Sequence, residues 1–568
     1  MPLKLPKTIK EIMAWKWDQF EPLYRQLVAE NVNASNVDAW LLDWSKLSEV
    51  VSEQNNRLYV ATSINTADEE AEKNLQEHLD TTFTHSKACE QRLKEKLLAS
   101  GLTPKGMEIP IRNMRAEAEL YREANVSLFA EEQKLSTEYD KIIGAQTIQW
   151  NGEERTFMQM YKVLVEENDR LTRERAWRTT RERILADKPA IYTLWKKFFE
   201  LRQQIAKNAD MPDYRAFAWK QKQRFDYTPE DCKDFHTAIE EVAVPASTRI
   251  HERRKQKMGL DTLRPWDTSV DSLSRPALKP FSTMEQLMEG TARMFDMVNP
   301  IFGRHFRVMM EEDLLDLNNR KNKAGGAYMT FFESTRKPFI FGNAVGIHLD
   351  VETLLHEGGH AFHGFEAARL PYIMQLNTPM EFNEVASMSM ELLGAPYLTE
   401  SGMYTPAEAA RARIEHLEGL IIFWPYMSLV DLFQHWIYEN PKEGIDPEKC
   451  EAQWNELYDR FLPGVDFSGL EPLRATEWLR QGHIHQSPFY YIEYGLAQLG
   501  AVQVWGNALK DKDKAVQSYR DALGLGATVS LPELFKTAGA RFAFDSDTLK
   551  TYVNLIEGQL EKLEEIES

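Results

Sequence analysis

Cysteine is scarce in this sequence, and its scarcity excludes two kinds of architecture. The 568 residues include three cysteines, Cys89, Cys232 and Cys450, which lie far apart and form no C-x-x-C pair. Disulfide-stabilised domains and thiolate zinc sites need several cysteines at close, regular spacing. We therefore expect neither a disulfide framework nor a thiolate zinc site.

Long apolar runs are also missing. No apolar stretch approaches the roughly 20 residues that a bilayer-spanning helix needs. Residues 1–8 lack the apolar core that signal peptides carry. These absences predict a protein without a membrane partner, located in a bacterial-type cytoplasm.

Positive charge is in deficit. The chain has 68 Lys and Arg residues against 87 Asp and Glu residues, which gives a formal net charge of -19. Proteins that bind nucleic acids neutralise phosphates with clustered Lys and Arg, so we expect no nucleic-acid partner. An acidic protein modestly favours the approach of cationic peptides.

No low-complexity linker and no internal repeat divide the chain. The stretch 260–280 is rich in Pro, Ser and Asp, but helical patterning resumes directly after it, so we interpret it as a surface loop. Apolar residues at three- and four-residue spacing predict a mainly helical protein. These patterns cover residues 74–100, 112–143 and 177–204. The dipeptide Asn151-Gly152 predicts one small hairpin.

The most informative motif is His356-Glu357-Gly358-Gly359-His360, which reads H-E-x-x-H. Histidines four residues apart share one face of a helix, so both imidazoles can reach a single Zn²⁺. Glu357 projects about 100° round the helix from His356, near a water that fills an open metal position. The motif indicates a metal-dependent hydrolase, with peptides as the expected substrates.

The surrounding residues predict a strand, a turn and then the metal-binding helix. Residues 338–346 look extended, Asp350 is a candidate N-cap, and Pro371 marks the end of the helix. Gly358 and Gly359 each weaken a helix by about 1 kcal/mol relative to Ala. Close approach of a substrate or another backbone would explain these glycines, and so would tight helix–helix packing.

A catalytic zinc set needs a third protein ligand, and the next predicted helix, from Thr378 to Gly394, offers acids. We expect Glu384 to be the ligand and Glu391 to accept a hydrogen bond from a zinc-bound imidazole. The spacing alone does not exclude Glu381 or Glu391 as the ligand. Two histidines and one glutamate favour zinc, one ion per chain, over cobalt or manganese.

These blocks resemble the oligoendopeptidase F and thimet oligopeptidase family of zinc metallopeptidases, in particular bacterial oligoendopeptidase F and the Pz-peptidases. The metal block comprises residues 356–363 and 381–387, followed by Glu391. Residues 323–328 are similar to the family's glycine-rich segment, and residues 483–494 to its His/Tyr-rich segment. The resemblance covers roughly residues 185–560, and its metal block is the most specific part.

The resemblance implies a mainly α fold, a two-lobed ellipsoid with a small β element beside the zinc-binding helix. A deep internal channel with zinc at its floor would admit oligopeptides and exclude folded proteins. We expect an N-terminal helical lobe over residues 1–185 and a catalytic region over residues 186–568, joined as one structural unit. The oligomeric state stays open.

The resemblance also implies roles for individual residues. Glu357 would act as the general base on the attacking water. The family uses tyrosine hydroxyls and a histidine to stabilise the oxyanion. Tyr491 and Tyr494 have the spacing of the tyrosine pair, with Tyr494 as the first choice, and His483 and His485 compete for the histidine role.

Other residues are expected to contact the substrate rather than the metal. They are Gly325, Gly326, Tyr328 and Tyr490. The glycine segment and the following strand could hold an extended peptide by edge pairing, and an ordinary turn is the rival interpretation. His363 shares the face of His356 and His360, but we do not expect it to bind zinc.

Two alternatives to an endopeptidase remain. A zinc carboxypeptidase on a similar helical scaffold would need a basic residue for the terminal carboxylate of the substrate, and no motif marks one. A non-catalytic peptide-binding protein could keep a vestigial metal site. The intact Glu357 argues against that alternative, because a binding protein has no need of a general base.

Overall fold

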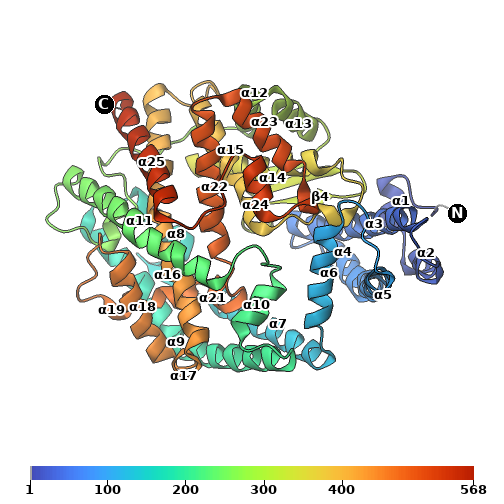
Figure 1. Cartoon of the computed structure of the whole chain (residues 1–568). Coiled ribbons are helices and arrows are strands. Elements are labelled where there is room, and N and C mark those ends of the chain that lie inside the picture. The colour runs from blue at the N-terminus through green and yellow to red at the C-terminus, as the bar shows by residue number, and fades with distance from the viewer. Residues whose placement is uncertain (1–2, 568) are drawn as a thin grey trace.

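Helices make up most of the molecule, which confirms the predicted mainly α fold. The computed structural model describes residues 3–567. The N-terminal helices lie at one side of the molecule, and the last helix, α25 (Ser546–Glu567), lies at the other side (Figure 1). No helix within the described range is both long and apolar enough to cross a bilayer.

Most of the first six helices enclose a separate apolar core, which Tyr372 from further along the chain also joins. Their bounds are α1 (Ile9–Ala14), α2 (Trp17–Ala29), α3 (Val37–Ile64), α4 (Glu69–His78), α5 (Thr84–Ser100) and α6 (Glu108–Leu120). Phe20, Trp40 and Trp44 are buried in this core. A π-helical turn at Leu79–Phe83 separates α4 from α5, so the pattern over residues 74–100 belongs to two helices.

The middle of the chain contains a small hairpin and the long helix α9. The elements are α7 (Glu123–Gly144), β1 (Thr147–Trp150), β2 (Glu153–Thr156), α8 (Phe157–Glu166), α9 (Arg170–Asn208), α10 (Tyr214–Gln221) and α11 (Pro229–Lys257). β1 and β2 pair antiparallel, and φ is 52° at Asn151 and 87° at Gly152. Positive φ at both turn residues is typical of a type I′ turn, so the predicted hairpin is confirmed.

The remaining helices form most of the main hydrophobic core. They are α12 (Met284–Val298), α13 (Pro300–Glu311), α14 (His348–Ala367), α15 (Met380–Gly394), α16 (Pro406–Glu439), α17 (Pro441–Gly444), α18 (Pro447–Phe461), α19 (Glu471–Arg474), α20 (Thr476–Arg480), α21 (Gly482–Gln486), α22 (Ile492–Ala508), α23 (Lys512–Leu523), α24 (Leu531–Thr537) and α25. α15 packs against α14 and α22, and α16 packs against α11 and α25. The H-E-x-x-H helix α14 is therefore held by α15 on one side.

A three-stranded sheet lies beside α14. Its strands are β3 (Leu315–Asn318), β4 (Tyr328–Phe332) and β5 (Lys337–Ala344), in the order β3-β5-β4. The central strand β5 is parallel to β3 and antiparallel to β4. α14 follows β5 after a short turn and packs against it, which confirms the predicted order of strand, turn and metal-binding helix.

Helix–helix packing explains the two glycines of the motif. A Cβ on Gly359 would lie 2.5 Å from the carbonyl oxygen of Ala386 in α15, and a Cβ on Gly358 would lie 2.5 Å from the ring of Phe295 in α12. Both distances are shorter than van der Waals contact. The missing side chain of Gly359 therefore lets α14 and α15 approach closely, and that of Gly358 makes room for Phe295 of α12. The approach of α15 brings its acids beside the histidines of α14.

Replacing Gly359 with Ala should destabilise the protein by about 1–3 kcal/mol, because a rigid backbone, not a flexible side chain, occupies the space. Urea unfolding monitored by circular dichroism measures this change. Gly419→Ala in α16 is the matched control, since nothing lies within 4 Å of its added Cβ. The control should be neutral or stabilising by up to about 1 kcal/mol. Equal stability of the two variants would contradict the packing argument.

Candidate metal centre

The N-terminus of α14 is fixed by a carboxylate within its first turn. One oxygen of Asp350 accepts hydrogen bonds from the backbone N–H groups of Val345, Gly346 and Ile347, at 2.8, 2.8 and 2.9 Å. The prediction that Asp350 is the N-cap is wrong, because the helix begins at His348 and Asp350 is the third residue of the helix. The carboxylate satisfies N–H groups that the helix itself leaves unpaired.

The start of α15 also differs from the prediction. The helix begins at Met380 after Pro379, and Thr378 makes no cap hydrogen bond. The Thr378 hydroxyl instead lies 3.3 Å from Nε2 of His363. The Thr378 side chain, which local sequence rules would assign to the helix cap, therefore contacts a residue of another helix instead. It also gives His363 a partner away from the other two histidines.

His356, His360 and Glu384 converge. One ligand atom of each lies within 4.8 Å of the other two. Oε2 of Glu384 is 3.5 Å from Nε2 of His356 and 3.7 Å from Nε2 of His360. Two atoms bound at about 2.1 Å to one tetrahedral ion are about 3.4 Å apart. The donor set and its spacing therefore fit one zinc ion.

Glu391 orients one of these imidazoles. Its Oε1 lies 2.6 Å from Nδ1 of His356, and its Oε2 lies 3.0 Å from Nε2 of His416 in α16. A carboxylate can only accept, so Nδ1 of His356 carries the proton and Nε2 is left for a metal. Burial opposes ionisation of Glu391, but hydrogen bonds from His356 and His416 outweigh it and lower its pKa to about 2.

The third acid of α15 is engaged elsewhere. Glu381 accepts a hydrogen bond of 2.6 Å from the hydroxyl of Tyr227, and its carboxylate lies 3.7 Å from Nε of Arg224. The three candidates left open by the sequence thus have different surroundings. Glu384 faces both imidazoles, Glu391 lies behind one of them, and Glu381 belongs to a separate buried polar group.

Replacing Glu391 with Gln should weaken metal binding by about 10–100-fold, because the side chain that orients and polarises His356 loses its charge. Competition with a chelator measures the affinity. Glu381→Gln is the matched control, since this acid is buried on the same helix but contacts Tyr227 and Arg224. If both variants weakened metal binding equally, a general loss of stability rather than the imidazole contact would be responsible.

Glu357 lies next to the three ligands. Its side chain is buried, and its Oε2 has no hydrogen-bond partner among the described residues. Burial raises the pKa of Glu357 to about 7, while the charge of His356 and the backbone of Met329 in β4 act in the opposite direction. An unpaired buried carboxylate oxygen beside an open metal position can accept a proton from water.

The two histidines of the His/Tyr-rich segment occupy different environments. His483 contacts the rings of Tyr490, Tyr491 and Tyr494, with centroid distances of 5.4, 5.1 and 6.0 Å. His485 is fully buried, and its Nε2 lies 3.2 Å from the carbonyl oxygen of Trp478. Of the two candidates, the geometry favours His483 for the histidine role, because aromatic side chains enclose His485; the role itself stays a prediction. These enclosing rings belong to Tyr139, Trp195, Phe198 and Trp478.

The three tyrosines of the segment lie together. The ring centroid of Tyr494 is 5.4 Å from that of Tyr490 and 5.8 Å from that of Tyr491. Burial is the main cause that raises the pKa of both Tyr490 and Tyr494, and the charge of Glu384 adds to it, so these two side chains lie near Glu384. Tyr491 also packs against Phe423 and Tyr426, at centroid distances of 5.8 and 6.1 Å. The structure therefore brings the predicted pair Tyr491 and Tyr494 into contact, and Tyr490 joins them.

The glycine segment before β4 forms an anchored turn. The side-chain amide of Asn343 in β5 donates to the carbonyl oxygens of Ala324 and Gly326, each at 2.8 Å. Gly325 and Gly326 are exposed, and a Cβ on either would meet nothing within 4 Å. Tyr328 starts β4 and stacks on Phe341 at 4.9 Å. A role of these residues in binding substrate stays a prediction.

Sequence reasoning missed several charged residues near the site. His416 has no motif around it and reaches Glu391 only because α16 packs nearby. Arg224 lies 2.7 Å from Oε1 of Glu493 and is fully enclosed. Lys222 lies over the ring of Tyr490, with its ammonium 5.1 Å from the centroid. The alternating cations at positions 220, 222 and 224 were the one signal available in the sequence.

Comparisons with known proteins relate the chain to oligopeptidases. The Oligoendopeptidase F homolog of Borreliella burgdorferi is 23% identical over 354 residues, or 59% of this chain and 57% of that protein. Oligopeptidase PepF of Bacillus subtilis is 24% identical over 346 residues, or 60% of this chain and 50% of that protein. The alignments thus span between half and three-fifths of the curated relatives.

A solved structure and two family models extend the likeness to nearly the whole chain. The structure of Pz-peptidase A with an inhibitor has a TM-score of 0.85 at 26% identity, and the match covers 97% of this chain and 99% of that one. The Peptidase M3 N-terminal domain matches residues 11–109, and Peptidase family M3 matches residues 163–554. Because this second match includes more than half of the sequence, with the helices α14 and α15 that carry the converging side chains, the chain belongs to peptidase family M3.

Proposed function

We propose that this protein is a zinc-dependent endopeptidase that hydrolyses oligopeptides. The observation that carries the proposal is the convergence of His356, His360 and Glu384, with Oε2 of Glu384 at 3.5 and 3.7 Å from the two imidazoles. Two histidines, one glutamate and an open position form a catalytic rather than a structural zinc set. Membership of a peptidase family and the names of the relatives support the same activity.

The residues around the ligands supply the proton transfers. When bound, a zinc ion lowers the pKa of a coordinated water and polarises a substrate carbonyl. Glu357 takes the proton of the attacking water and delivers it to the leaving amine. Glu391 keeps His356 in the tautomer that presents Nε2 to the site.

The tyrosines near Glu384 are placed to stabilise the oxyanion. We assign this role to the hydroxyls of Tyr494 and Tyr490, and we assign His483, which contacts both rings, to the support of this pair. Preorganised donors of this kind act most strongly where water is excluded. Tyr491 contacts Tyr494 at 5.8 Å but also packs against Phe423 and Tyr426, so we assign it to the support of Tyr494 rather than to the oxyanion.

An extended substrate fits the sheet beside α14. β4 is an edge strand in the order β3-β5-β4, and the backbone of Met329 in β4 lies close enough to affect the pKa of Glu357. A peptide that pairs with β4 would therefore run past the metal ligands. We place Gly325, Gly326 and Tyr328 at one end of that path.

The larger architecture belongs to the same proposal. We propose that an N-terminal lobe over residues 1–185 and a catalytic region over residues 186–568 enclose a channel that limits the length of the substrate. The separate apolar core, built mostly from helices within the first 120 residues, is consistent with such a lobe. A cytoplasmic location stays a prediction from the scarcity of cysteine and of apolar runs.

Internally quenched peptides blocked at both ends test the proposed activity. We expect hydrolysis by the purified protein, loss of hydrolysis after treatment with a chelator, and recovery on addition of Zn²⁺. Peptides of increasing length test the channel, since rates should fall beyond a limiting length. Failure to hydrolyse any blocked peptide with zinc present would reject the endopeptidase assignment.

One observation favours a second candidate, a carboxypeptidase. Lys222 makes no ion pair with any acid of residues 3–567, although its ammonium lies over Tyr490. The nearby Glu493 is committed to Arg224 at 2.7 Å. Burial lowers the pKa of Lys222 to about 8, against the opposing charge of Glu493. A cation without a partner beside the tyrosines could hold the terminal carboxylate of a substrate.

Replacing Lys222 with Gln should raise KM about tenfold for peptides with a free C-terminus and leave C-terminally amidated peptides unchanged, since a hydrogen bond to a charged group contributes about 1.5–3 kcal/mol. Lys220→Gln is the matched control, because Lys220 pairs with Glu119 near the surface. Cleavage restricted to free C-termini and lost in the Lys222 variant would establish a carboxypeptidase. Equal KM values for both peptide types in the variant and in the wild type would remove Lys222 from substrate binding.

A further inference from the structure

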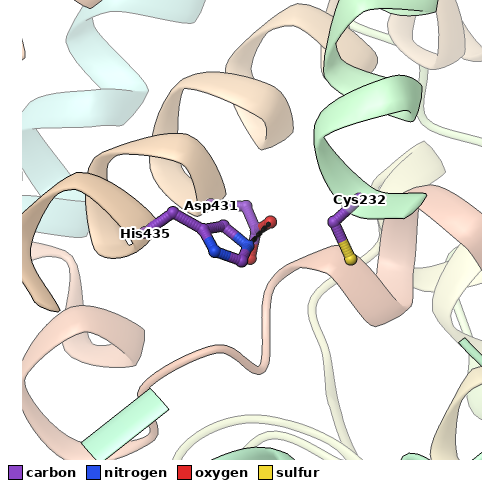
Figure 2. A group of neighbouring side chains, drawn as sticks. All are labelled: Cys232, Asp431 and His435. Atoms are coloured by element: carbon purple, nitrogen blue, oxygen red, sulfur yellow. Dashed lines mark ion pairs between the residues drawn. The ribbon is translucent and has the colours of Figure 1, made fainter. Parts of the chain in front are cut away.

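A second group of metal-ligating side chains lies in the core, away from the H-E-x-x-H helix. Cys232 lies on α11, and Asp431 and His435 lie on the neighbouring helix α16 (Figure 2). His236 follows Cys232 by four residues on α11, and His435 follows Asp431 by four residues on α16. Each helix therefore presents two potential ligands on one face. Metal sites in helical proteins are often built from such facing pairs.

The distances within this group suit a single ion. One ligand atom each of Cys232, Asp431 and His435 lies within 4.8 Å of the other two. Oδ2 of Asp431 is 3.3 Å from Nε2 of His435 and 3.0 Å from Nε2 of His236. Two atoms held at about 2.1 Å by a tetrahedral ion are about 3.4 Å apart. His236 is not one of the three residues whose ligand atoms lie within 4.8 Å of one another. It contacts Asp431, and residues that orient a metal ligand make contacts of this kind.

The group is sealed from solvent and incompletely hydrogen-bonded. Cys232, Asp431 and His435 have no exposed area, and His236 is 1% exposed. Oδ1 of Asp431 and Nδ1 of His236 lack a hydrogen-bond partner among the described residues. Buried polar atoms without partners are rare and costly in proteins. Rings of Trp219 and Phe489 close the space beside His435, at 5.8 and 5.4 Å.

The charge of the group also lacks a simple counterpart. No Lys or Arg within residues 3–567 forms an ion pair with Asp431, so the imidazoles are its charged partners only when one of them is protonated. Arg215 lies 3.4 Å from Nδ1 of His435, but its own ion pair is with Glu439. A bound divalent cation would take the place of the imidazole proton. Its two positive charges would balance the negative charges of the Asp431 carboxylate and of a Cys232 thiolate.

We propose that Cys232, Asp431 and His435 bind a second divalent transition metal ion, with zinc as the preferred ion, and that this ion ties α11 to α16. Thiolate, imidazole and carboxylate are the ligand types that zinc accepts in proteins. The sequence predicts no thiolate zinc site, because Cys232 has no cysteine neighbour. The fold supplies its partners from a helix about two hundred positions away in the chain. Because no water reaches the group, the ion stabilises the fold and takes no part in peptide hydrolysis.

Metal counting by mass spectrometry tests this inference on the full-length protein. We expect two zinc ions per chain in the wild type, one in Cys232→Ser and Asp431→Asn, and one in His360→Ala. Cys450→Ser is the matched control, since Cys450 is equally buried but its thiol faces the carbonyl oxygen of Gly444. This control should keep two ions.

Cobalt substitution separates the two sites without any assay of activity. The ligands on α14 and α15 include no thiolate, so a thiolate-to-cobalt charge-transfer absorption reports on the second site alone. We expect this absorption in His360→Ala and in its combination with Cys450→Ser, and its loss in the combination with Cys232→Ser. One zinc ion per chain in the wild type, with no such absorption in cobalt-treated His360→Ala, would overturn the inference and leave a hydrogen-bonded His–Asp–His group. That result would not affect the proposed peptidase activity.

Discussion

Replacing Glu357 with Gln should reduce kcat for peptide hydrolysis by about 10²–10⁴-fold, the range that general acid–base catalysis contributes. The amide of Gln has nearly the same shape as the carboxylate but cannot accept the proton of the attacking water. The metal ligands are untouched, so zinc content, folding and KM should stay close to wild type. Initial rates on blocked quenched peptides, together with metal analysis of the same samples, measure the effect.

The control for this variant is Glu366→Gln, on the same helix. Glu366 pairs with Arg520 at 2.6 Å and lies at the far end of α14. The Glu366→Gln variant should retain near wild-type turnover and show at most a small loss of stability. Unchanged turnover in Glu357→Gln would overturn the mechanism, and it would revive the hypothesis that the metal site is vestigial.

Replacing His360 with Ala should abolish zinc binding at the active site and with it all measurable peptide hydrolysis. Loss of a residue that only orients a ligand costs about 10–100-fold in metal affinity, and loss of a ligand itself costs more. Nε2 of His360 lies 3.7 Å from Oε2 of Glu384. Without His360, the group of converging side chains keeps two ligands, His356 and Glu384. Chelator competition and activity measured across a zinc titration give the two readouts.

His363→Gln is the matched control for His360→Ala. His363 shares the helix and the face, but the structure places its Nε2 3.3 Å from the Thr378 hydroxyl and its ring 6.2 Å from Phe382. The variant should be less stable and should still bind zinc at the active site. Loss of that zinc in His363→Gln, with retention in His360→Ala, would reassign the ligand.

The sequence determined much of the metal site because helix geometry is local. The four-residue spacing of His356 and His360 places both imidazoles on one face wherever the helix lies. It also limited the third ligand to three acids on the next helix. The choice among Glu381, Glu384 and Glu391 needed tertiary structure, because it depends on the rotation of α15 against α14 and on the partners Tyr227, Arg224 and His416.

The His/Tyr-rich segment shows what spacing could and could not predict. Residues 483–494 run from the short helix α21 into the first turn of the long helix α22, across a non-helical stretch at residues 487–491. His483, Tyr491 and Tyr494 lie in one cluster, and Tyr490 joins them. His485 lies in the aromatic core instead. Its position does not follow from spacing, since no single helical or extended period runs through the segment.

The sequence alone determined the helical class, the family and the two imidazoles, because these depend on periodicity and on one compact motif. Tertiary structure decided which acid joins them, since two backbones approach closely at Gly359 only when α14 and α15 are packed. It also decided that Cys232 has metal-binding neighbours. Residues far apart in the chain become one chemical group only when buried apolar surface forces their helices together.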